Sequence, residues 1–247
     1  MSKLRSAIPS FFTLGNLFFG FFSIVSSFHG LYTQAAWLIV IAGVFDAVDG
    51  KVARWVNSAS EFGAELDSLC DIVSFGLAPS MLVYVYAFSA VPLPFDLPIA
   101  VGVFLAFLPS LGGAIRLARF NVMSRGKTEH KNYFVGLPIP ASAATIATFI
   151  VFTHSVYGID YAPKALVFLL PMLAFLMVSK VKYHALPQLT FKQSPKGQAQ
   201  FLFVIFCVVA MAVAPVKTAF PLILLYLSYG ILRAVFGLFV HPKAVAH

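Results

Sequence analysis

The chain has 247 residues, of which 60% are hydrophobic and only 11% are charged, and it contains 27 phenylalanines. Soluble domains carry about 25% charged residues, so this composition excludes a water-soluble globule, and the density of apolar side chains excludes a disordered chain. The net charge of +8 is not concentrated in a basic segment with interleaved aromatic residues, so we expect no nucleic-acid partner.

Apolar segments follow one another along the chain, and a transmembrane helix needs roughly 20 such residues. The first segment, from about Phe11 to Phe28, is longer than the apolar part of a cleavable signal peptide, so we interpret it as a retained span. Strand-like alternation is absent, and helices must therefore satisfy the backbone in lipid. The sequence predicts an all-α, polytopic membrane helical bundle with about eight transmembrane helices, at residues 10–28, 33–53, 66–88, 97–119, 137–157, 163–180, 199–214 and 218–239.

The distribution of basic residues predicts the orientation of this bundle. With a cytoplasmic N-terminus and eight spans, fifteen of the seventeen Lys and Arg residues fall on the cytoplasmic side, and only Lys164 and Lys217 fall outside. Cytoplasmic loops are enriched in Lys and Arg, so this split favours a protein with both termini in the cytoplasm.

Acidic residues are concentrated in one part of the chain. Six of the nine lie within residues 46–71, namely Asp46, Asp49, Glu61, Glu65, Asp67 and Asp71. Asp46 and Asp49 are three residues apart and Asp67 and Asp71 are four apart, so each pair shares one face of a helix. A short polar turn at residues 57–60 joins the two helices. We therefore expect four carboxylates to converge at the cytoplasmic ends of two neighbouring helices.

Carboxylates at such short range repel one another and require compensating charge. Lys51 and Arg54 are too few to neutralise six acids, so structural ion pairs alone do not explain the cluster. Oxygen ligands suit magnesium, manganese or calcium, and a pair of such cations is a common device in phosphoryl transfer. Gly50 and Gly63 leave room for a ligand to approach the backbone, and Arg54 can contact a phosphate.

The whole segment reads Asp46-x2-Asp49-Gly50-x2-Ala53-Arg54-x8-Gly63-x3-Asp67-x3-Asp71. It resembles the signature of the CDP-alcohol phosphatidyltransferases, with every defining position filled. The resemblance implies a membrane enzyme that uses two divalent cations, Mg²⁺ or Mn²⁺, to move a phosphatidyl group from a CDP-linked lipid to an alcohol. It implies that Asp46, Asp49 and Asp67 hold one metal, that Asp46, Asp67 and Asp71 hold the other, and that Asp71 is the catalytic base. It also implies CDP contacts at Asp49, Gly50, Ala53, Arg54, Ser60 and Gly63.

Further stretches are similar to the phosphatidylserine synthase branch of this family: residues 8–16, 67–79, 116–121 and 134–140. This similarity implies CDP-diacylglycerol, or its ether-lipid equivalent, and L-serine as substrates, and the family resemblance also implies a homodimer. The predicted topology places the active site on the cytoplasmic side. Arg116 and Arg119 share a helix face on which an arginine fork can hold the carboxylate of serine or a lipid phosphate, and Asn121 can add an amide contact. We expect one integral-membrane domain over residues 1–247, with a family-like core at about 8–180 and an extra C-terminal helix pair at about 199–239.

Two alternatives remain at this point. The same chemistry can serve another alcohol, namely glycerol 3-phosphate, inositol phosphate or choline. A divalent-cation transporter could use the same four carboxylates, although it would predict acids spread through the depth of the membrane. The clustering of the acids at one end of two helices favours the enzyme.

Overall fold

The computed structural model describes residues 2–56, 61–89, 95, 97–124, 133–157, 162–179, 181–184, 211 and 213–240. Helices dominate this part of the chain, which confirms the prediction of an all-α protein. They are α1 (Ser2–Phe28), α2 (Tyr32–Val56), α3 (Glu61–Asp71), α4 (Ala78–Val83), α5 (Ile99–Ser124), α6 (Ile139–Val156), α7 (Ala162–Val178) and α9 (Pro215–Val240), with π-helical turns η1 (Ile72–Leu77) and η2 (Tyr84–Phe88). The predicted span at 199–214 lies mostly outside the described residues.

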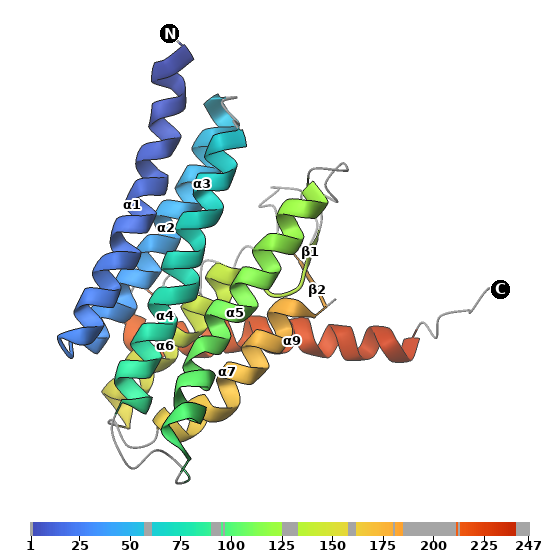
Figure 1. Cartoon of the computed structure of the whole chain (residues 1–247). Coiled ribbons are helices and arrows are strands. Elements are labelled where there is room, and N and C mark those ends of the chain that lie inside the picture. Colours follow the sequence, from blue (N-terminus) through green and yellow to red (C-terminus); the bar gives the residue numbers. More distant parts are fainter. Residues whose placement is uncertain are drawn as a thin grey trace.

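Helices α1 and α2 form an antiparallel hairpin along one side of the molecule (Figure 1). The turn between them contains Gly30 with a positive φ of 74°. The backbone N–H of Gly30 donates to the carbonyl of Ser27, and that of Leu31 donates to the carbonyl of Ser26. This pattern is a Schellman motif, which ends a helix at a residue in the left-handed region, usually glycine. The glycine that punctuates the apolar pattern in the sequence therefore fixes where α1 ends.

Segments α3, η1, α4 and η2 follow one another without a break from Glu61 to Phe88, and this long helical unit packs against α1. Where Gly20 meets this unit, a Cβ atom added to it would lie 2.7 Å from the Cα atom of Ser74. Small residues allow membrane helices to approach to backbone contact in this way. Gly20 therefore determines how near α1 can come to the helix that carries Asp67 and Asp71.

One short ribbon interrupts the helical architecture in the described residues. Strand β1 (Tyr133–Val135) pairs antiparallel with β2 (Lys182–His184). Gly136 follows β1 with a φ of 79°, and a Cβ atom there would lie 2.4 Å from the carbonyl oxygen of Met177. Only glycine fits this position, because its backbone is left-handed and runs directly against the end of α7. The ribbon thus ties the start of α6 to the end of α7.

The distribution of side chains fits a protein surrounded by lipid. Large apolar side chains face outward, among them Phe62 and Phe175, which are 75% and 72% exposed. Small polar side chains such as Ser23, Ser74 and Thr145 lie buried between the helices. Within the described residues, four helical segments are long and apolar enough to cross a membrane, at 11–28, 62–88, 99–122 and 139–156. Several apolar helices therefore fit an integral membrane protein.

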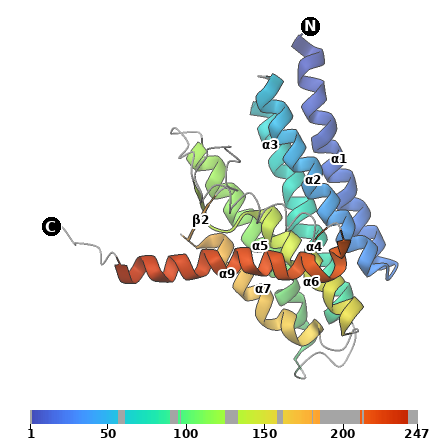
Figure 2. The same cartoon turned by 180° about the vertical axis from the view of Figure 1, so that it is seen from behind.

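The structure does not confirm the predicted count of eight spans. Helix α7 is a shorter apolar helix, and α2 is not among the four candidate segments. Helix α9 includes the whole predicted span at 218–239, but it crosses the other helices rather than running beside α1 and α2 (Figures 1 and 2). It packs mainly on α6. Hydropathy correctly predicts that this segment is an apolar helix, but it carries no information on the direction in which the helix runs.

Candidate active site

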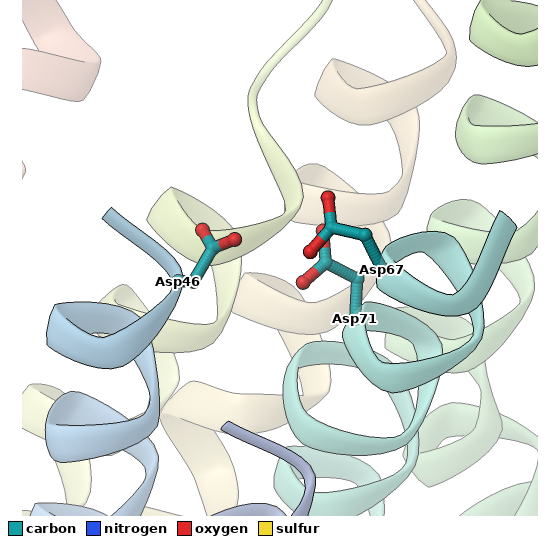
Figure 3. Close-up of side chains that lie close together, drawn as sticks. All are labelled: Asp46, Asp67 and Asp71. Carbon is teal, nitrogen blue, oxygen red and sulfur yellow. The ribbon is translucent and has the colours of Figure 1, made fainter. Parts of the chain in front are cut away.

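Three of the four predicted metal ligands meet between α2 and α3. Asp46 extends from α2, and Asp67 and Asp71 extend from successive turns of α3 (Figure 3). One carboxylate oxygen from each lies within 4.8 Å of the others, and all three residues are partly buried. The spacing of four residues on α3 places its two carboxylates on the face that α2 approaches, as the sequence predicts.

The donor set of this triad fits a hard divalent cation. Three carboxylates at this range repel one another, and a bound cation removes the repulsion. The Oδ1 atom of Asp67 is buried, and within the described part of the chain it has no hydrogen-bond partner. Together with the two neighbouring carboxylates, this oxygen forms a site that offers oxygen ligands only. Mg²⁺ and Mn²⁺ fit such a site, whereas zinc usually takes His or Cys ligands as well.

Asp49, the fourth predicted ligand, lies beside the triad and outside the group of three. Its side chain is only 6% exposed, and its Oδ2 atom accepts a hydrogen bond from the Thr13 hydroxyl of α1. Asp49 is still near enough to Asp46 and Asp67 to interact with both electrostatically. Three of the four acids thus form a compact group, and the fourth, Asp49, lies next to this group and accepts a hydrogen bond from α1.

Helix α1 also contacts the triad directly. The Nδ2 atom of Asn16 donates a hydrogen bond of 3.1 Å to Oδ1 of Asp71, and the backbone carbonyl of Asn16 accepts one of 2.9 Å from the Ser74 hydroxyl. Neither Thr13 nor Asn16 was predicted to take part in the site. A usable signal was present, because these two polar residues are three apart and share one face of the apolar stretch between Phe11 and Phe22.

The predicted CDP contacts are only partly within the described residues. A Cβ atom added to Gly50 would meet no atom of the described residues within 4 Å, so this part of the structure leaves the backbone of α2 accessible to a ligand one residue beyond Asp49. Gly63 lies in α3, one turn before Asp67. Ala53 and Arg54 belong to α2, but their side chains lie outside the described residues, as does all of Ser60.

The predicted acceptor residues lie on α5. Arg116 is near enough to Asp71 and to Tyr226 of α9 for electrostatic interaction, and its Nε atom is buried with no partner in the described part of the chain. Arg119 instead donates through Nη1 to the carbonyl of Val178, at 3.4 Å. The Nδ2 atom of Asn121 donates to the hydroxyl of Ser68, the neighbour of Asp67, at 3.2 Å. Of these three residues, Arg116 is the one that extends toward the triad. The contribution of Tyr226 from a distant helix was not predicted.

Comparison with known proteins identifies the family to which this arrangement belongs. The model of the CDP-alcohol phosphatidyltransferase family matches residues 6–181, which include the triad, Thr13, Asn16 and the α5 residues. The chain belongs to the CDP-alcohol phosphatidyltransferase family. The apolar helices around the acidic cluster are thus those of a phospholipid-synthesising transferase family, and these comparisons do not support the transporter alternative.

Relatives from bacteria and archaea extend this assignment. A Helicobacter pylori (strain J99) protein named CDP-diacylglycerol–serine O-phosphatidyltransferase is 33% identical over 92% of this chain and 91% of its own length. A Bacillus subtilis protein of the same name is 35% identical over 71% of this chain and 89% of its own length. A Methanothermobacter thermautotrophicus protein named archaetidylserine synthase is 35% identical over 72% of this chain and 69% of its own length.

Proposed function

We propose that the protein transfers the phosphatidyl group of CDP-diacylglycerol, or of an ether-lipid equivalent, to L-serine, producing a phosphatidylserine-type lipid and CMP. The observation that carries the proposal is the meeting of Asp46, Asp67 and Asp71 within 4.8 Å, in a chain whose relatives are named for serine as acceptor. The relative named archaetidylserine synthase supports an ether-linked donor as the second form of the lipid substrate.

Two divalent cations, Mg²⁺ or Mn²⁺, complete the proposed site. Asp46, Asp49 and Asp67 would hold one cation, and Asp46, Asp67 and Asp71 would hold the other, as the family signature implies. The cations supply positive charge that compensates the charge developing on the phosphates during transfer. The proximity of Asp46, Asp67 and Asp71 supports this assignment, as does the Oδ1 atom of Asp67, which has no hydrogen-bond partner among the residues that the structure describes.

In the proposed reaction Asp71 accepts the proton of the serine hydroxyl. The hydroxyl oxygen then forms a bond to the phosphorus of the lipid phosphate. The bond from that phosphorus to the bridging oxygen breaks, and CMP leaves with the electron pair. Among the acids of the triad, Asp71 is the one that accepts a hydrogen bond from Asn16 and interacts electrostatically with Arg116, so its carboxylate would lie beside an acceptor that Arg116 binds.

Arg116 is the residue that we assign to the carboxylate of serine. Its guanidinium is near enough to Asp71 and Tyr226 to interact with both electrostatically, and its buried Nε has no hydrogen-bond partner among the described residues. A carboxylate bound there would place the hydroxyl of the same small molecule beside Asp71. Arg119 and Asn121 would then line the approach to this position, and Gly50, Ala53, Arg54, Ser60 and Gly63 would contact the cytidine diphosphate.

We further propose that residues 1–247 form a single integral-membrane domain whose site opens to the cytoplasm. The excess of Lys and Arg on that side of the predicted topology supports this orientation. The acyl or ether tails would then remain among the exposed phenylalanines while serine and the nucleotide enter from water. A homodimer, and a C-terminal helix pair at about 199–239 that adds to a catalytic core at about 8–180, complete the proposal.

The decisive experiment measures CMP release by the purified protein from CDP-diacylglycerol in the presence of Mn²⁺. L-serine, glycerol 3-phosphate, inositol phosphate, choline and no acceptor are compared side by side. We expect release that depends on serine and is lost in Asp71→Asn, whereas Glu65→Gln, which changes an exposed acid of α3, keeps activity. Release with a different alcohol would overturn the choice of serine, and no release with any acceptor would overturn the proposed chemistry.

A further inference from the structure

We propose that Thr13 and Asn16 of α1 are positioning residues, which hold Asp49 and Asp71 in the orientation that metal binding requires. This inference rests on the proposed function, because it assigns α1 a role toward the same cations. Thr13 donates a hydrogen bond to Oδ2 of Asp49, and Asn16 donates one of 3.1 Å to Oδ1 of Asp71.

The two contacts connect one helix to both helices that carry the acids. Thr13 and Asn16 lie three residues apart on the same face of α1, and they are 4% and 0% exposed. Asp49 belongs to α2 and Asp71 to α3. A change in the distance between α2 and α3 would therefore stretch at least one of these hydrogen bonds. Helix α1 thereby controls the spacing of the two sets of carboxylates.

A third contact fixes the position of α1 along its axis. The hydroxyl of Ser74 donates a hydrogen bond of 2.9 Å to the backbone carbonyl of Asn16, and Gly20 lies one turn further on, in backbone contact with Ser74. The hydrogen bond sets the height of Asn16 relative to Asp71, and the missing side chain of Gly20 permits the close approach. Asn16 is consequently held from both its backbone and its side chain.

The chemistry of Asn16 argues against a role in packing alone. Its side chain is completely buried, and its Oδ1 atom has no donor within the described residues. A buried amide with an unsatisfied oxygen costs stability that an apolar side chain of similar size would not. The benefit that remains is the hydrogen bond to Asp71, which fixes the rotation of that carboxylate about its Cβ–Cγ bond. Groups that orient metal ligands in this way commonly affect metal affinity.

The test measures Mn²⁺ binding to the purified full-length protein in detergent, without substrate, from the electron paramagnetic resonance signal of free Mn²⁺. Thr13→Val and Asn16→Leu remove the donors with little change in size, and Thr13→Ser keeps the hydroxyl. Ser26→Ala is the matched control, because Ser26 is a buried hydroxyl on the same helix without a partner in the described residues. Thermal unfolding of every variant is recorded in parallel.

We expect Thr13→Val and Asn16→Leu each to weaken Mn²⁺ binding by about 10- to 100-fold, with Thr13→Ser and Ser26→Ala close to the wild type. The proposal is overturned if Thr13→Val binds Mn²⁺ as tightly as the wild type, or if Thr13→Ser is impaired as much as Thr13→Val. The comparison of Thr13→Val with Thr13→Ser decides the question even if Asn16→Leu does not fold. A wild-type protein that binds Mn²⁺ but does not use serine would instead refute the proposed function.

Discussion

Replacing Gly50 by alanine separates a role in ligand binding from a role in stability. A Cβ atom at this position meets no atom of the described residues within 4 Å, so the substitution loses no packing and creates no clash with this part of the chain. Alanine is favoured over glycine inside a helix by about 0.8–1.0 kcal/mol. For a protein of this size, 1 kcal/mol corresponds to about 2–4 °C in Tm. The variant is therefore expected to be as stable as the wild type, or slightly more stable.

The kcat/KM of Gly50→Ala for the lipid substrate is expected to fall, although its stability does not. Gly50 follows Asp49 directly, and the added methyl group would occupy the open space into which the phosphates of the CDP-lipid are proposed to fit. Overpacking of a well-filled site costs about 1–3 kcal/mol, which is about 5- to 150-fold in kcat/KM for the lipid substrate. The measurements are CMP release at varied CDP-diacylglycerol and thermal unfolding in the same detergent.

Gly43→Ala supplies the control for this experiment. Gly43 lies two turns earlier in α2, and a Cβ atom there would make an ordinary contact of 3.7 Å with the Phe75 ring. The same gain in helix propensity applies, but no ligand is proposed at that position. Gly50→Ala with an unchanged kcat/KM, or equal losses in both variants, would refute the reasoning.

Three further predictions concern the acceptor site, the ribbon and the metals. Arg116→Lys keeps the charge but loses the fork, so the KM for serine should rise at least ~10-fold while the KM for CDP-diacylglycerol stays constant; a parallel rise in both would contradict a specific role for the carboxylate. Gly136→Ala should lower the Tm, because its Cβ would lie 2.4 Å from the Met177 carbonyl oxygen, and an unchanged unfolding curve would show that the ribbon can relax. Removal of divalent cations by a chelator should abolish CMP release, and added Mg²⁺ or Mn²⁺ should restore it; activity that survives complete chelation would exclude the metal site.

The meeting of Asp46, Asp67 and Asp71 could be predicted because it depends on local geometry. A spacing of four residues fixes the relative positions of Asp67 and Asp71 on one helix, and a short connection keeps the helix of Asp46 close by. The helices of the described core were predictable for a similar reason, since long apolar segments leave the backbone of a membrane protein little choice other than a helix.

The role of α1 could not be predicted in this way. The contacts of Thr13 with Asp49 and of Asn16 with Asp71 span 36 and 55 residues along the chain. A polar residue in an apolar helix indicates that it faces protein rather than lipid, but not which helix it faces. The position of Tyr226 near Arg116 was hidden for the same reason, because it depends on the direction in which α9 crosses the bundle.

The π-helical turn that follows Asp71 has a consequence for how this protein tolerates changes in length. Segment η1, Ile72–Leu77, contains more residues per turn than an α-helix. Each residue of this turn therefore rotates the backbone by less than the roughly 100° of an α-helical residue, so the stretch holds about one residue more than an α-helix needs for the same rotation. Deleting one codon here would let regular α-helical hydrogen bonding continue with the acidic turn and α4 in nearly their present relation, and both could still contact α1. The same deletion in the regular helix of α4 would remove no surplus residue and would turn the parts on either side of it by about 100° relative to each other. A gene could therefore lose a codon in the π-helical turn and still specify a protein whose helices fit together around the signature.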